Sequence, residues 1–126
     1  MLTFNSEWAF ELCKNISGKE TEGALVIKAV EVPRDVSSSG IFTLRLVFKD
    51  GMCIESVVSK EDLDGDYVLE GRFEDFIKIL EGSLPPFAAF ALGKVGLRKG
   101  ELSKLADYMP LALDIVEKAR ELLLKK

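Results

Sequence analysis

The sequence contains no histidine, and this absence excludes several kinds of active site at once. A Ser-His-Asp or Cys-His nucleophile requires an imidazole, as does any metal site with histidine ligands. The segment from Gly93 to Leu97 lacks the spacing of a phosphate-binding P-loop, and no Gly-x-Gly-x-x-Gly motif follows a strand. The stretch from Asp62 to Asp66 lacks the glycine and glutamate of a calcium loop. We therefore expect a protein that is not an enzyme, with no cofactor and no metal.

The chain also lacks an excess of basic residues and a long apolar run. Its 17 Lys and Arg residues against 21 Asp and Glu residues give a net charge of −4, which disfavours nucleic acid and anionic membranes as partners. No window reaches the ~18 apolar residues that a membrane helix needs. The first ten residues do not resemble a signal peptide. These features predict no nucleic acid partner, no stable membrane insertion and a cytoplasmic location.

Cysteine is scarce and glutamine is absent. Cys13 and Cys53 have no Cys-x-x-Cys spacing, and unpaired cysteines are commonly buried, so we expect two reduced, buried thiols. The chain has no glutamine and only two asparagines, and a shortage of these thermolabile residues is typical of heat-adapted proteins.

The remaining pattern predicts one domain over residues 1–126, in the usual size range. A helix starts near Asn5, with Ser6 as its cap, and stops at Gly18. Strands are expected over 24–32, 41–49, 52–59 and 66–71, as an antiparallel meander. The strand at 41–49 alternates between apolar and mostly polar residues, and Asp50-Gly51 favours a tight hairpin turn.

After residue 72 the apolar residues no longer recur at every second position but at the spacing of a helix. Helices are expected over 73–81 and from Pro86 to Leu92, followed by a strand over 94–100. The C-terminal part forms a helix that is interrupted near Pro110. This order of elements is typical of the α+β class.

The segment from Phe87 to Leu92 is uncharged and lies between two prolines and Gly93. Such a segment most often packs in the core. The other interpretation is that it lines a cavity for an apolar ligand, since such sites are mostly hydrophobic.

Short motifs in the second half resemble the sterol carrier protein 2 (SCP2) family. They are Asp75-Phe76, Gly82-Ser83-Leu84-Pro85-Pro86, Ala89-Phe90-Ala91-Leu92-Gly93-Lys94, Gly100 and Lys104-Leu105, in the order of the family. Leu92 stands where the family often has glutamine, and Gly96 stands where it tends to have a bulkier residue. The resemblance implies a five-stranded, mostly antiparallel sheet that is covered on one face by helices, with a hydrophobic tunnel between the layers. It also implies non-enzymatic binding or transfer of fatty acids, fatty acyl-CoA, phospholipids or isoprenoid or sterol-like lipids.

On this basis we expect a set of apolar residues to line the tunnel. They are Phe76, Ile77, Leu80, Leu84, Phe87, Phe90, Leu92, Met109, Leu113 and Val116. Lys94 and Arg98 are candidates for contact with a charged head group. The alternative is a protein-interaction or accessory module of a larger enzyme system. Its cavity would be filled by its own side chains. The last helix has an apolar stripe, which would then be an interface, for example in a homodimer; the stripe consists of Ala112, Ile115 or Val116, Ala119, and Leu122 or Leu123.

Overall fold

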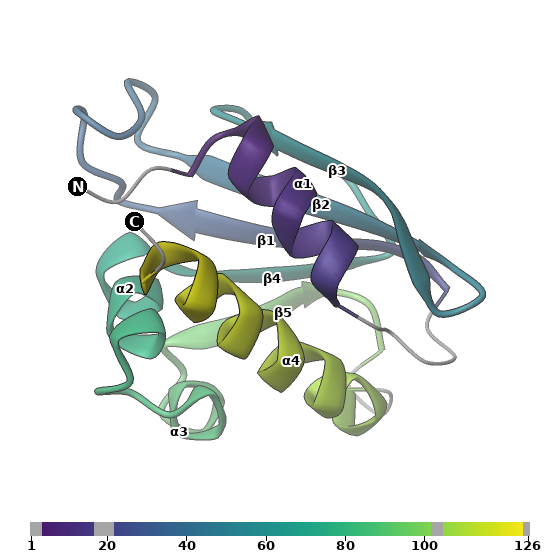
Figure 1. The fold of residues 1–126 in the computed structure, drawn as a ribbon. Helices are drawn as coiled ribbons and strands as arrows, with labels where there is room; N and C mark the ends of the chain where they lie inside the picture. Colours follow the sequence, from purple (N-terminus) through teal and green to yellow (C-terminus); the bar gives the residue numbers. More distant parts are fainter. Residues whose placement is uncertain (1–3, 17–21, 102–104, 125–126) are drawn as a thin grey trace.

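A computed structural model describes residues 4–16, 22–101 and 105–124, apart from the side chains of 105–109, 123 and 124. The described chain forms one mixed sheet with helices on one of its faces (Figure 1). The strands are β1 (Gly23–Val30), β2 (Phe42–Lys49), β3 (Met52–Ser59), β4 (Tyr67–Arg72) and β5 (Val95–Lys99). The helices are α1 (Ser6–Asn15), α2 (Phe73–Glu81), α3 (Pro86–Ala91) and α4 (Leu105–Leu124). The predicted α+β class is confirmed.

The strand order across the sheet is β3-β2-β1-β4-β5. β1 and β4 run parallel, and the other neighbouring pairs are antiparallel, so the sheet is mostly antiparallel as expected. Asp50 and Gly51 both have positive φ angles, 52° and 78°, and connect β2 to β3 in the predicted hairpin turn. Leu44, Leu46 and Phe48 are buried, which confirms the inward face of the alternating strand.

The predicted meander is wrong at one connection. β3 and β4 follow one another in the chain but lie on opposite sides of β2 and β1. The connection between them crosses the sheet and is held by polar contacts. The hydroxyl of Thr43 donates to the carbonyl of Glu61 at 2.6 Å, and the backbone N–H of Ala24 donates to Asp66 Oδ2 at 2.8 Å. β4 therefore pairs with β1, and not with β3, which precedes it in the sequence.

Helix ends are set by local chemistry, with two differences from expectation. The side chain of Asn5, and not that of Ser6, accepts the backbone N–H of Trp8 at 2.9 Å and caps α1. Gly82 adopts the left-handed conformation and ends α2 as predicted. The expected stop at Gly18 lies outside the described residues. α4 is not interrupted, because it continues through Pro110 as one helix. A proline removes only one backbone hydrogen bond from the helix, and the buried side chains of Leu111, Ile115 and Ala119 that follow it stabilise the remainder.

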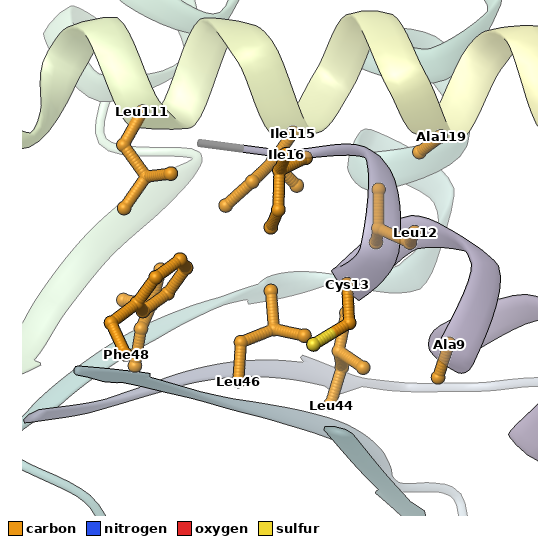
Figure 2. Packing of buried hydrophobic residues seen from close by; sticks show 11 residues of the cluster. Ala9, Leu12, Cys13, Ile16, Leu44, Leu46, Phe48, Leu111, Ile115 and Ala119 are labelled. Carbon is orange, nitrogen blue, oxygen red and sulfur yellow. The ribbon is translucent and has the colours of Figure 1, made fainter. Parts of the chain in front are cut away.

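The main core lies where α1 and α4 pack on β1 and β2. In Figure 2, Leu111, Ile115 and Ala119 of α4 point toward Leu44, Leu46 and Phe48 of the sheet. None of the described helices is long and apolar enough to cross a membrane.

The two cysteines are joined in a disulfide, so the prediction of reduced thiols is wrong. Cys13 of α1 and Cys53 of β3 are 40 residues apart in sequence and have Cα atoms 5.3 Å apart. Spacing along the chain could not reveal this pair, because α1 and the edge strand β3 are distant in sequence and lie side by side only in the assembled fold. The bond ties α1 to the sheet next to the main core.

Candidate functional site: an apolar cavity between sheet and helices

A cavity of about 140 Å³ lies between the sheet and the helices. Its floor includes Leu25, Ile27 and Ala29 of β1, which point to the same face because strand side chains alternate. At roughly 3.3 Å per residue, these three residues extend over about 13 Å. Lining residues of β2, β4 and β5 extend the floor across the sheet on both sides of β1.

All four helices contribute to the walls. The lining residues outside β1 come from α1 (Trp8 and Leu12), α2 (Phe73, Phe76, Ile77, Ile79 and Leu80), α3 (Pro86 and Phe90), α4 (Ala112, Ile115, Val116 and Ala119), the other strands (Phe42, Leu44, Leu69 and Val95), and Phe4 before α1. The cavity is thus the space between the sheet and its covering helices that their side chains leave unfilled.

The described side chains that line the cavity carry no carboxylate, amine, thiol or hydroxyl. Their one polar group is the indole N–H of Trp8, whose Nε1 is buried and has no hydrogen-bond partner among the described residues. A wall of this kind cannot move protons or attack a carbonyl, because each of those steps requires a positioned titratable or nucleophilic group. It can bury a hydrocarbon. Among the described residues, no cluster of three or more metal-ligating side chains occurs.

A buried carboxylate lies close to the cavity without lining it. Asp75, in the first turn of α2, is 1% exposed, and its Oδ2 lies 3.4 Å from Nε of Arg72. Its Oδ1 lies 3.8 Å from Nζ of Lys94. The carboxylate thus links the start of α2 to the turn before β5. The sequence placed this acid at a helix N-terminus, where it complements the helix dipole, and the structure adds two cationic partners.

Five of the residues expected in the tunnel line the cavity: Phe76, Ile77, Leu80, Phe90 and Val116. Leu84 does not line it and packs instead beside Ile79, Ala89 and Val95. The side chain of Met109 lies outside the described residues.

Three other expected residues, Phe87, Leu92 and Leu113, are exposed and do not line the cavity. The short helix α3 explains two of them. Pro86 and Phe90 are four residues apart and share its inner face, so Phe87 points outward and is 73% exposed. Leu92 follows the last residue of α3 as its C-cap, and it is 67% exposed.

The two head-group candidates are both paired with carboxylates. Lys94 faces Asp75, as described above. Nε of Arg98 lies 3.3 Å from Oε2 of Glu70. Because Leu69 lines the cavity, the adjacent Glu70 points to the opposite face of the sheet, and Arg98 lies there with it. The structure therefore brings Lys94, but not Arg98, to the helical side.

Sequence reasoning missed the floor of the cavity and the contribution of α1. Phe42 and Leu44 lie in the alternating strand expected over 41–49, and Trp8 and Leu12 lie in the helix expected after Asn5, but the sequence does not link either pair to a cavity. Those periodicities were the available signal, since inward faces of both layers must border any space between them.

No family model and no curated protein matches the sequence. Solved structures match the fold. One is a conserved hypothetical protein from Thermus thermophilus, named as a candidate sterol carrier protein, with a TM-score of 0.82, 25% identity and coverage of 97% of this chain and 90% of that one. Another is a sterol carrier protein 2, with a TM-score of 0.81, 25% identity and coverage of 93% and 96%. A palmitated sterol carrier protein 2-like protein from Aedes aegypti matches less closely, with a TM-score of 0.58, 19% identity and coverage of 89% and 95%.

Proposed function

Because the chain is an SCP2-like domain, we propose that it binds lipids non-covalently in the cavity between its sheet and its helices. The observation that carries the proposal is the wall of the cavity, whose described residues offer apolar side chains from both layers and no reactive group. Burying hydrocarbon there gains about 0.8 kcal/mol per methylene, which is enough for useful affinity from an acyl or isoprenoid chain alone. The protein acts by binding and transfer, without catalysis.

The size of the cavity restricts the part of the ligand that enters it. About 140 Å³ is close to an engineered cavity of ~150 Å³ that holds benzene, and below the ~300 Å³ at which small-molecule sites usually begin. A single hydrocarbon chain fits this small space better than a fused ring system. Fatty acids and fatty acyl groups are therefore favoured over sterols, and a long chain widens the cavity as it enters.

The polar end of the lipid stays outside the apolar wall. Lys94 is the candidate for contact with it, because its amine lies on the helical side and its side chain is 36% exposed. Engagement of a carboxylate or phosphate there competes with Asp75 for the same amine.

A second candidate function is protein interaction, as a module with no ligand of its own. The exposed apolar side chains of Phe87 and Leu92 on and next to α3 favour it, since they gain from being covered. A partner subunit or a second copy of the chain would bury them.

The location of the protein bears on both candidates. A disulfide such as Cys13–Cys53 is rare in a reducing cytosol, although intracellular proteins of hyperthermophiles are an exception. The cytoplasmic location expected from the sequence therefore stays a prediction, and it requires that exception.

Native mass spectrometry of freshly purified protein, followed by lipid extraction, tests the proposal. We expect a bound acyl or isoprenoid lipid, and we expect Val116→Phe to lower its occupancy because Val116 lines the cavity. Leu113→Phe is the matched control on the same helix, since Leu113 is exposed. An unliganded mass that does not shift with a panel of acyl chains and isoprenoids would contradict lipid binding and favour the interaction module.

A further inference from the structure

We propose that Phe4 closes one end of the cavity and sets the longest hydrocarbon chain that the cavity holds. This inference rests on the proposed function, because it assigns a specificity-determining residue to the same site.

The ring of Phe4 is the centre of an aromatic cluster from three elements. Its centroid lies 5.0 Å from that of Trp8 in α1, 5.9 Å from that of Phe42 in β2 and 6.2 Å from that of Phe73 in α2. The contacts with Trp8 and Phe73 are edge-to-face, an arrangement that aromatic rings favour. All four residues line the cavity.

The strand register places this cluster at one end of the cavity. Phe42 is the first residue of β2 and pairs with Ala29, the last cavity-lining residue of β1. Ala29 also pairs with Gly71, two residues before Phe73 begins α2. The opposite limit of the floor is Leu25, four residues back along β1. A chain lying along β1 therefore meets the aromatic cluster at the Ala29 end.

Phe4 differs from the other three rings in how it is held. It precedes α1 and belongs to no helix or strand, whereas Trp8, Phe42 and Phe73 are part of α1, β2 and α2; all four rings are partly buried. Because Phe4 lines the cavity and is also partly exposed, its ring lies between the cavity and the solvent, as a part of the wall that no helix or strand holds. Removing the ring opens the Ala29 end and leaves the floor and the four helices in place.

The test measures the affinity of saturated fatty acids of increasing chain length by isothermal titration calorimetry. The proteins compared are the wild type, Phe4→Ala, Phe4→Leu and the control Phe10→Ala. Phe10 lies on α1 but is 58% exposed and does not line the cavity. Each methylene buried is worth about 0.8 kcal/mol, or about fourfold in Kd. Affinity should rise with chain length until the chain reaches Phe4, and then level off.

In Phe4→Ala we expect the plateau to begin at least two methylenes later. The longest acids then bind about tenfold or more tightly than to the wild type, since each of two methylenes is worth about fourfold. Phe10→Ala should reach its plateau at the same chain length as the wild type. The plateau of Phe4→Leu should begin between those of the wild type and Phe4→Ala, and this variant replaces Phe4→Ala in the test if the alanine variant does not fold. A folded Phe4 variant with an unmoved plateau overturns this inference alone. A wild type that binds no chain overturns the proposed function as well.

Discussion

The disulfide between Cys13 and Cys53 leads to a quantitative prediction for the double variant Cys13→Ser/Cys53→Ser. The bond closes a loop with a sequence separation of 40 residues, and cross-linking such a loop removes entropy from the unfolded chain. The loop-entropy relation gives about 4 kcal/mol for this length at 25 °C. The variant should be less stable than the oxidised wild type by that amount.

The expected change in melting temperature follows from the size of the protein. An unfolding entropy of about 2.1 cal/mol/K per residue gives the 126-residue chain about 0.26 kcal/mol/K. A loss of about 4 kcal/mol therefore lowers the melting temperature by about 15 °C. Differential scanning calorimetry measures this shift directly.

The reduced wild type is the matched control, since it lacks the bond but keeps both side chains. It should melt near the double variant, and reductant should leave the variant unchanged. A thiol assay on the unfolded, unreduced wild type should find no free thiol. Two free thiols, or a variant that melts within a few degrees of the oxidised wild type, would refute the reasoning.

Two further predictions concern charged groups. Asp75→Ala should lower the free energy of unfolding by about 1–3 kcal/mol, because Arg72 and Lys94 lose their buried partner; urea denaturation measures this, and an unchanged midpoint would contradict it. The hydrogen bond with Asp62 raises the pKa of Lys28 above 10.5, with a further contribution from Glu70. The ion pairs of the charged Lys28 amine stabilise the fold fully below pH 10.5. This stabilisation is lost as the pH rises through the pKa of Lys28 in the folded state. Lys28→Gln should therefore flatten the alkaline end of the stability–pH profile, and a wild-type profile in the variant would contradict the assignment.

Local patterns predicted most individual elements of this fold. The alternation from Phe42 to Phe48 identified a strand with one buried face, and Asp50-Gly51 identified its turn, because both signals depend on neighbouring residues. The strand order could not be read in the same way. Whether β4 pairs with β3 or with β1 depends on contacts such as Thr43 with Glu61, which lie far apart in sequence.

The candidate site was predictable on its helical side and poorly predictable elsewhere. Phe76 and Leu80 were found from the period of α2, and Phe90 from an apolar segment without charge. The same segment also suggested Phe87, which is exposed, because six residues of helix cannot direct every apolar side chain inward. Phe4 stands outside any periodic pattern, so only the assembled structure reveals its position.

Trp8 provides the most direct test of the central claim, that a hydrocarbon chain lies in the cavity. It is the only tryptophan in the chain and lines the cavity wall, so its fluorescence reports contact with a ligand. A fatty acid brominated along its chain quenches an indole that it touches. We predict saturable quenching at one fatty acid per protein, weakened in Val116→Phe and retained in Leu113→Phe. Quenching that is absent, or that rises without saturation and equally in all three proteins, would contradict a lipid site in this cavity.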